Sequence, residues 1–496
     1  MKLFHFLFCS FFIFNIYGQT TIVQRIEFAS ENQITQTIPF GNNGLLYQNN
    51  IEKKSKQDKN NTVNSYTLFN TNLDRVKTID VKTPKKYSVH LESKSAHKFF
   101  EIAIDKHKNY IIHAISIPQL DVTSLHGKLP KNLYIHAVES LDDYMFIKAS
   151  TRKFYFIFIK NMINGEESFT QYTPVSARDF NMLGFKADSS SNELYIIYRD
   201  KINNEITTIV EIYTQGKKSN EFIIPNGTEK FLLNGSLSKT KDNAYILCGT
   251  FGNRHKDMMS VGIYICKLKH KKIEFIQFVN YLDIKNFMIN LPEKKQERII
   301  KRKEKKEKKG NDIFISYMIA PHKIIEYNNE YILIAEAFYP TYKQECYTVP
   351  TGSGGTTTQC TVVFNGYEYT HYFIYTFDQK GNPIWSNTKK MNISYKPFRV
   401  ETFVNANITN NNLVTLYGTD KEFYYTAFNQ KGEEISSETH ISITSENESE
   451  SIKKSSMITE HWYDNFFIAY GFQKIKNTDE KEKRNVFFIN KIEVKP

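Results

Sequence analysis

The hydrophobic residues of this chain occur in short runs that polar turn residues separate. One phrase recurs, an Asn or Asp turn followed by a run of aromatic and aliphatic residues, as in Asn192–Ile197 and Asn329–Ile334. The other copies begin at Asn43, Asn109, Asp143, Asn243, Asn412 and Asn465. Short runs of β-branched and aromatic residues between turn residues are typical of strands, and Asn and Asp accept the positive φ of tight hairpins. The pattern predicts an all-β protein built from hairpins.

A second phrase consists of an alternating aromatic strand, a polar turn and another strand. Its clearest copies are Phe377–Trp385 and Phe428–Ile435, and weaker ones lie at Tyr66–Ile79, Tyr155–Phe169, Ile209–Ile223, Ile263–Phe275 and Val486–Val494. A unit of about 50 residues with two hairpins forms a four-stranded sheet, and such sheets bury both faces by stacking radially into a β-propeller. The alternative, a set of β-sandwich domains, requires a period of about 100 residues.

The spacing of the copies bears on the number of blades. The interval between Asn109 and Asp143 is too short for a four-stranded blade, so the sequence favours seven blades, with eight or six as alternatives. We expect the strand Ile22–Phe28 to complete the sheet of the C-terminal segment Val486–Val494. The resulting prediction is a single propeller domain over 19–496, with insertions at 282–312 and 339–370.

The phrase Phe377-Asp378-x-x-Gly381-x-x-x-Trp385 resembles the outer hairpin of secreted bacterial propellers, including quinoprotein-like and uncharacterised Bacteroidota ones. The motif is readable only in the segment 329–385. It departs from the sialidase Asp box, because Gly381 lies three residues after Asp378 instead of two. The resemblance implies a fold and a compartment, and it implies no activity.

The N-terminus has the pattern of a secretory signal peptide over 1–18. Lys2 precedes an apolar run from Leu3 to Ile16, and Gly18 is a small residue suited to cleavage. The run is shorter than the roughly 20 residues that a membrane-spanning helix needs, and no later segment is apolar enough. The sequence predicts a secreted or periplasmic/cell-surface protein without a transmembrane span. An uncleaved N-terminal anchor is the alternative.

Four cysteines follow the signal segment, an even number that suggests disulfides in an exported protein. Cys346 and Cys360 flank a Gly-rich loop, and we expect them to form a bridge. Cys248 and Cys266 face each other if the intervening hairpin folds about position 257. A second disulfide and two buried free thiols are both compatible with that spacing.

The long insertions are predicted to lie on one face. In a four-stranded blade the Asn/Asp turns join the first and second strands, and the Gln-Lys-Gly turns of the second phrase join the third and fourth. The long segments join the second and third strands or link two blades, which places them on the opposite face: 49–64, 252–260, 281–312, 338–370 and 473–485. Long loops are usually functional or disordered, so this face is the candidate binding surface.

Aromatic and titratable residues gather near the longest insertion. Tyrosines are good contact groups for proteins or glycans, so the ligand-face candidates are Tyr339, Tyr342, Tyr347, Tyr367, Tyr369, His371, His322 and Glu336. Glu336 ends a buried strand and needs a partner, which His322 or His371 can supply. A structural pair is favoured over catalysis. The chain contains no HExxH, GxSxG or CxxC motif, so no catalytic residue, metal or cofactor is assigned.

The insertion 282–312 carries a charged segment in which Pro292 precedes a helix starting at Glu293. The net charge of the chain is +12, and much of the excess lies between Lys294 and Lys309. Glutamates are interleaved at i,i+3 and i,i+4 spacings, typical of a solvated helix. A basic arm for an anionic surface is the functional alternative. Aromatic residues are not interleaved, which argues against specific nucleic-acid binding.

These features favour a binding or scaffold protein whose long-loop face recognises a protein, glycan or other surface ligand. The alternative is a propeller-fold glycan-active hydrolase or lyase, which would use carboxylates about 5–10 Å apart.

Overall fold

The computed structural model describes residues 19–30, 35–50, 60–174, 179–225, 229–350, 355–396, 400–420, 422–436, 439–442, 449–477 and 483–495. The predicted signal peptide, 1–18, lies outside these residues. The chain divides into two compact units, Ser30–Val404 and the remainder, in which the N-terminal segment joins residues 405–496. Within the described part, no helix is both long and apolar enough to cross a membrane.

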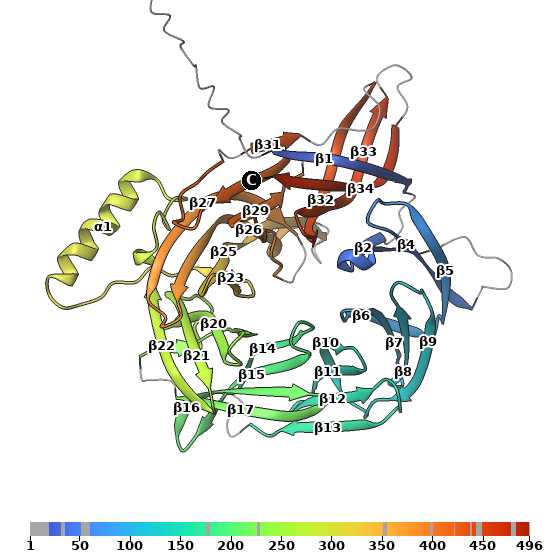
Figure 1. Cartoon of the computed structure of the whole chain (residues 1–496), viewed down its shortest axis with the longest axis horizontal. Helices are drawn as coiled ribbons and strands as arrows, with labels where there is room; N and C mark the ends of the chain where they lie inside the picture. The colour runs from blue at the N-terminus through green and yellow to red at the C-terminus, as the bar shows by residue number, and fades with distance from the viewer. Residues whose placement is uncertain are drawn as a thin grey trace, which may run out of the picture. The chain divides into compact units, whose positions relative to one another are not determined.

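The unit Ser30–Val404 contains six antiparallel sheets, whose strands follow one another in chain order (Figure 1). The first sheet contains β2 (Thr35–Pro39), β3 (Leu45–Asn50), β4 (Asn61–Phe69) and β5 (Arg75–Pro84). The second contains β6 (Tyr87–Lys94), β7 (Lys98–Asp105), β8 (Asn109–Ser116) and β9 (Val122–Lys128). The third contains β10 (Tyr134–Leu141), β11 (Tyr144–Ser150), β12 (Tyr155–Asn161) and β13 (Glu167–Tyr172).

In two of the next three sheets the first strand is broken into two pieces. The fourth sheet contains β14 (Asn181–Asp188), β15 (Glu193–Ile202), β16 (Glu205–Thr214) and β17 (Lys217–Pro225). The fifth contains β18 (Phe231–Leu232) and β19 (Ser236–Lys239), the two pieces of its first strand, with β20 (Tyr245–Gly252), β21 (Gly262–Lys269) and β22 (Lys272–Asn280). The sixth contains β23 (Met318–Pro321) and β24 (Ile325–Tyr327), the two pieces of its first strand, with β25 (Glu330–Pro350), β26 (Thr356–Asp378) and β27 (Pro383–Tyr395). The short helices η1 (Gly41–Asn43) and η3 (Tyr281–Asp283) and the helix α1 (Glu293–Glu307) lie in connections.

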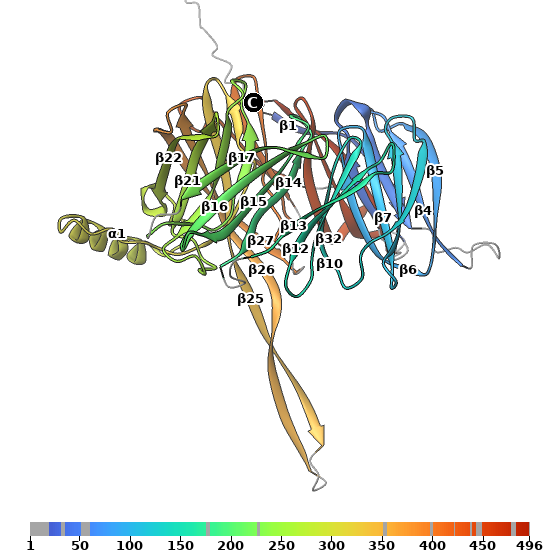
Figure 2. The same cartoon turned by 90° about the horizontal axis from the view of Figure 1, so that it is seen from below.

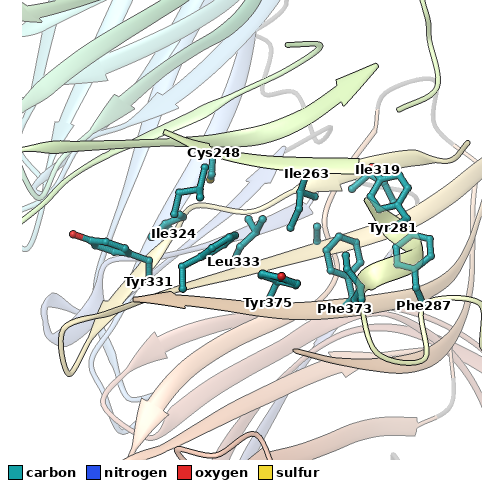
Figure 3. Close-up of a cluster of buried hydrophobic side chains, with 14 of the residues drawn as sticks. Cys248, Ile263, Tyr281, Phe287, Ile319, Ile324, Tyr331, Leu333, Phe373 and Tyr375 are labelled. Carbon is teal, nitrogen blue, oxygen red and sulfur yellow. The ribbon is translucent and has the colours of Figure 1, made fainter. Parts of the chain in front are cut away.

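The hydrophobic cores of this unit lie between successive sheets. One core joins β20 and β21 to β25 and β26 through residues such as Ile263, Leu333 and Phe373 (Figure 3). Four further clusters join the other neighbouring pairs in the same way. Because each of the four inner sheets of this unit buries one face against the preceding sheet and the other against the next, the arrangement is the radial stacking of a β-propeller. The predicted fold class is confirmed.

The other unit contains two four-stranded sheets with a shared core. One sheet is β28 (Asn405–Thr409), β29 (Asn412–Gly418), β30 (Glu422–Phe428) and β31 (Thr439–Ser442), and the other is β32 (Glu450–Tyr463), β33 (Phe466–Asn477), β34 (Lys483–Lys495) and β1 (Gln19–Ala29). β1 pairs antiparallel with β34, with Ile26 opposite Ile489. The expectation that the first strand completes the C-terminal sheet is therefore confirmed.

The described residues form eight sheets, whereas the sequence favoured seven blades and kept eight as an alternative. The preference for seven rested on the short interval between Asn109 and Asp143. Asn109 opens β8, the third strand of its sheet, whereas Asp143 precedes β11, the second strand of the next sheet. The two copies mark different turns, so the short interval does not indicate an incomplete sheet.

Val486–Val494 was predicted to contain a turn, but it lies within the single strand β34. The other turn phrases lie where the pattern predicts. Asn192 (φ 51°) and Asn243 (φ 57°) have the left-handed backbone expected between first and second strands. Gly381 (φ 83°) and Gly432 (φ 73°) lie between third and fourth strands. The long connections join second and third strands or link two sheets, as expected, although 51–59 and 478–482 lie outside the described residues.

Cys248 and Cys266 do not form the second disulfide that the sequence left open. Both are buried free thiols. Cys248 pairs with Ile265, and Cys266 pairs with Leu247. A register one residue away from the expected one places the two thiols on opposite faces of the sheet, so they contribute to two different cores.

Candidate binding surface

The insertion 339–370 is a two-stranded ribbon and not a loop. β25 and β26 continue outward well past their neighbours, and Figure 2 shows the ribbon projecting away from the sheets of its unit. β23 pairs with β25 only as far as Phe338, and β27 pairs with β26 only from Tyr367. We call Tyr339–Pro350 with Thr356–Gly366 the ribbon. Among the described strands, none pairs with its outer edges.

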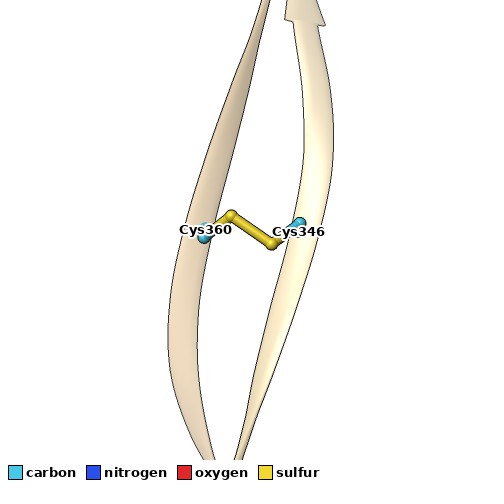
Figure 4. Close-up of a disulfide and its surroundings, with 2 residues drawn as sticks. All are labelled: Cys346 and Cys360. Atoms are coloured by element: carbon cyan, nitrogen blue, oxygen red, sulfur yellow. A yellow bond between two sulfur atoms is a disulfide. The ribbon is translucent and has the colours of Figure 1, made fainter.

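Cys346 and Cys360 pair directly across the ribbon and form a disulfide (Figure 4), as the sequence predicted. Partners across a strand pair share a face, and alternate residues return to it. Tyr342, Gln344 and their partners Phe364 and Val362 therefore lie on the face that carries the disulfide. Val362 is 73% exposed and Tyr342 is 62% exposed. Apart from Gln344, these residues are apolar, and the face is accessible.

The predicted tyrosines separate into an exposed and a packed group. Tyr339 and Tyr347 are about half exposed, like the neighbouring Tyr342. Tyr367 is partly buried between Phe338 and Phe364. Tyr369 is buried, and its hydroxyl donates to the carbonyl of Glu401 at 2.7 Å. Only the first three are available to a large partner, while the other two anchor the base of the ribbon.

Glu336 is fully buried and is held by several donors. Its Oε1 accepts hydrogen bonds from the backbone N–H groups of Phe403 and Val404, both at 2.8 Å, and lies 2.7 Å from His322 Nε2. The sequence offered His322 or His371 as its partner, and the structure selects His322. The contacts tie β25 to the chain leaving the sheet, which is the structural role that the sequence favoured.

His371 lies on the opposite face of the sheet. It directly precedes Tyr372, the partner of Glu336, and is itself paired with Ala337. Its ring packs edge-on against Phe287 and Tyr317, and Nδ1 lies 2.9 Å from the Thr370 hydroxyl. Burial lowers the pKa of His371 to about 3. The residue belongs to the core between two sheets, so it is not part of the ligand face.

The helix α1 begins at Glu293 after Pro292, as predicted, and none of its residues is buried. Ten Lys or Arg residues and four Glu residues lie between Glu293 and Lys309. Lys303 forms ion pairs with Asp283 at 2.5 Å and with Glu307 at 3.6 Å, an i,i+4 pair. These contacts fix the helix next to η3, and its remaining basic surface faces outward. Its role toward an anionic surface stays a prediction.

A cavity of about 740 Å³ lies on the same face as the long connections, and the sequence did not indicate it. Its wall is built from the start of β14, the end of β15, the β20–β21 connection and β23. Polar residues of this wall include Asn181, Arg199, Asn234 and His255. These residues are up to about 75 positions apart in the sequence, and only Arg199 interrupts a hydrophobic strand pattern in a way that could have signalled the site.

No family model matches the chain, and no curated protein matches its sequence. Solved propellers resemble it in structure. The β-propeller domain of the Trilobed protease from Pyrococcus furiosus is 8% identical over 82% of this chain and 99% of that one, with a TM-score of 0.35. The Dos1 propeller is 7% identical over 96% and 95%, with a TM-score of 0.41.

A structure from a study of two prolyl endopeptidases is 9% identical over 80% of this chain, with a TM-score of 0.36. This chain spans 48% of the length of that protein. At such similarity the assignment of the propeller fold depends on the sheets and cores described above.

Proposed function

We propose that the protein is a secreted or periplasmic β-propeller that binds a protein partner through its ribbon. The observation that carries this proposal is the projecting ribbon itself, with exposed Tyr342 and Val362 beside an exposed disulfide. Exposed tyrosines supply contact area at a low cost in side-chain entropy, and an apolar patch rimmed by polar residues is typical of an interaction site.

The chemistry of the ribbon favours a protein over a polyanion. Its only charged residues are Lys343 and Glu345, which pair with each other at 2.6 Å. Its outer edges present backbone N–H and C=O groups, and an extended segment of another protein can add to such an edge as a further strand. A ribbon without net charge and with open edges has little to offer a polyanion, whose binding depends on released counterions.

The disulfide supports both the binding role and the compartment. A two-stranded ribbon is marginally stable by itself, and a cross-link lowers the entropy that the ribbon would lose when it binds. Disulfides persist in oxidising compartments, in keeping with the predicted signal peptide at 1–18.

The test is removal of the ribbon from an otherwise intact chain. A variant that joins Thr341 to Asn365 through an Asn-Gly turn lacks Tyr342–Phe364 and keeps the paired base of β25 and β26. We expect proteins that co-purify with the full chain from its producing cells to be absent from the variant. A control with Lys301→Ala and Lys305→Ala on α1 should retain them. Retention of the same proteins by the shortened variant would refute the proposal.

A further inference from the structure

The cavity contains a buried arginine whose charge is incompletely compensated. Arg199 lies on β15 and is 4% exposed. Its Nη1 donates to the carbonyl of Leu232 at 3.3 Å, and its buried Nε has no hydrogen-bond partner among the residues that the structure describes. A buried guanidinium donor without an acceptor is costly, so a site that keeps one has a reason to bind an acceptor.

Two acidic residues near Arg199 have other partners. Asp179 is the carboxylate that acts on Arg199, but it lies 3.2 Å from His255 Nε2. Asp257 accepts a hydrogen bond from the backbone N–H of Arg254. Burial lowers the pKa of Arg199 more than Asp179 raises it. The protein alone therefore does not offset the desolvation of this guanidinium.

The walls of the cavity differ in polarity. Arg199, Asn181 and Asn234 lie on the side formed by β14, β15 and the β18–β19 connection, whereas Met318 and Phe338 come from the sheet that contains β23. The Nε side of a guanidinium is part of the fork that binds a carboxylate through two hydrogen bonds. The volume of about 740 Å³ is in the range of small-molecule sites.

We propose that this cavity is a binding site for a small amphipathic carboxylate, whose carboxylate group pairs with Arg199 and whose apolar part lies against Met318 and Phe338. The site is separate from the ribbon, and it does not depend on the function proposed for the ribbon. A ligand that binds only the folded state stabilises it against unfolding. Once the ligand concentration exceeds the dissociation constant, this stabilisation grows with the logarithm of the ligand concentration.

The experiment compares sodium butyrate with its neutral isostere butyramide, at ionic strength matched with sodium chloride, in thermal unfolding of the full chain. We expect butyrate to raise the Tm progressively, by roughly 2 °C at ten times its dissociation constant, and butyramide to leave it unchanged. Arg199→Met should abolish the butyrate shift, and Lys256→Met, which removes another cation of the cavity wall, should preserve it.

Equal curves for butyrate and butyramide in the wild-type protein would overturn the proposal, and this comparison does not depend on any variant folding. A butyrate shift that persists in Arg199→Met, or one that disappears in Lys256→Met, would also overturn it. Loss of partner binding on ribbon removal, with the butyrate shift intact, would show that the two proposals succeed or fail separately.

Discussion

Glu336 and His371 are buried titratable residues in one sheet, and the register between β25 and β26 gives them different surroundings. The sequence indicated that Glu336 is buried, because it ends a run of apolar residues. It could not decide between His322 and His371 as the partner, because that choice depends on which face each strand presents. A shift of one residue reverses the answer, and the same uncertainty produced the wrong geometry for Cys248 and Cys266.

The first residue-scale prediction concerns Glu336→Ala. The substitution leaves the N–H groups of Phe403 and Val404 without their acceptor, so we expect the free energy of unfolding to fall by about 3 kcal/mol. Urea denaturation followed by circular dichroism measures the change. Glu345→Ala on the exposed ribbon is the control, with an expected change within about 0.5 kcal/mol. Equal small effects of both substitutions would contradict the structural role of Glu336.

The second residue-scale prediction concerns His371 and the pH dependence of the free energy of unfolding. Its folded pKa, about 3, is below the ordinary value of 6.5, so the unfolded chain binds the proton more tightly. The contribution of the neutral ring to the free energy of unfolding is therefore fully present above about pH 6.5. As the pH falls from there toward 3, this contribution decreases by about 1.4 kcal/mol per pH unit. We expect His371→Leu to flatten the stability profile between pH 6.5 and 4. An unchanged slope in that variant would contradict the assignment.

At the scale of elements, the ribbon is the feature that the sequence described only in part. The cysteine pair and the crowd of tyrosines marked its position, and the Gly-rich turn marked its tip. The segment Thr356–Phe364 is rich in Thr and Val, a strand signal that the length of the insertion obscured. The sequence therefore predicted a closed loop where the structure has two paired strands. The charged helix α1, in contrast, follows directly from Pro292 and its charge spacing.

The element-scale prediction concerns the disulfide. Cys346→Ser with Cys360→Ser removes a cross-link that spans 14 residues, worth about 3 kcal/mol in the chain-entropy account. Because the ribbon lies outside the cores between sheets, we expect the loss to be local. Limited proteolysis should cut the double variant within the ribbon much faster than the wild-type protein, while the Tm of the main transition stays within about 2 °C. Equal cleavage rates would show that the ribbon is ordered without its disulfide.

At the scale of the whole molecule, the periodicity of turns and hydrophobic runs was enough to predict the propeller. It was not enough to count the sheets, because Asn109 marks a different turn from the other copies. The cavity around Arg199 escaped prediction for a related reason. Its wall combines residues from several sheets, and their meeting depends on how each sheet stacks on the next.

The prediction of one domain over 19–496 is tested at this scale by Phe488→Ala. Phe488 is fully buried on β34, and Arg25 on β1 lies over its ring at 4.7 Å. We expect a loss of about 3–5 kcal/mol. In a single domain, calorimetry should show one transition that shifts as a whole, whereas Ile163→Ala on an exposed turn should leave it in place. A separate early transition in Phe488→Ala would contradict the single domain.

The central claim, that the ribbon is the binding surface, is tested most directly by site-specific photo-crosslinking in the producing cells. A photoreactive residue at Val362 (73% exposed) reports on the ribbon, and the same residue at Ile163 (74% exposed), in the turn between β12 and β13, is the matched control. The account predicts discrete crosslinked protein adducts at Val362 that are absent at Ile163. The same adducts at both positions, or none at Val362, would contradict it.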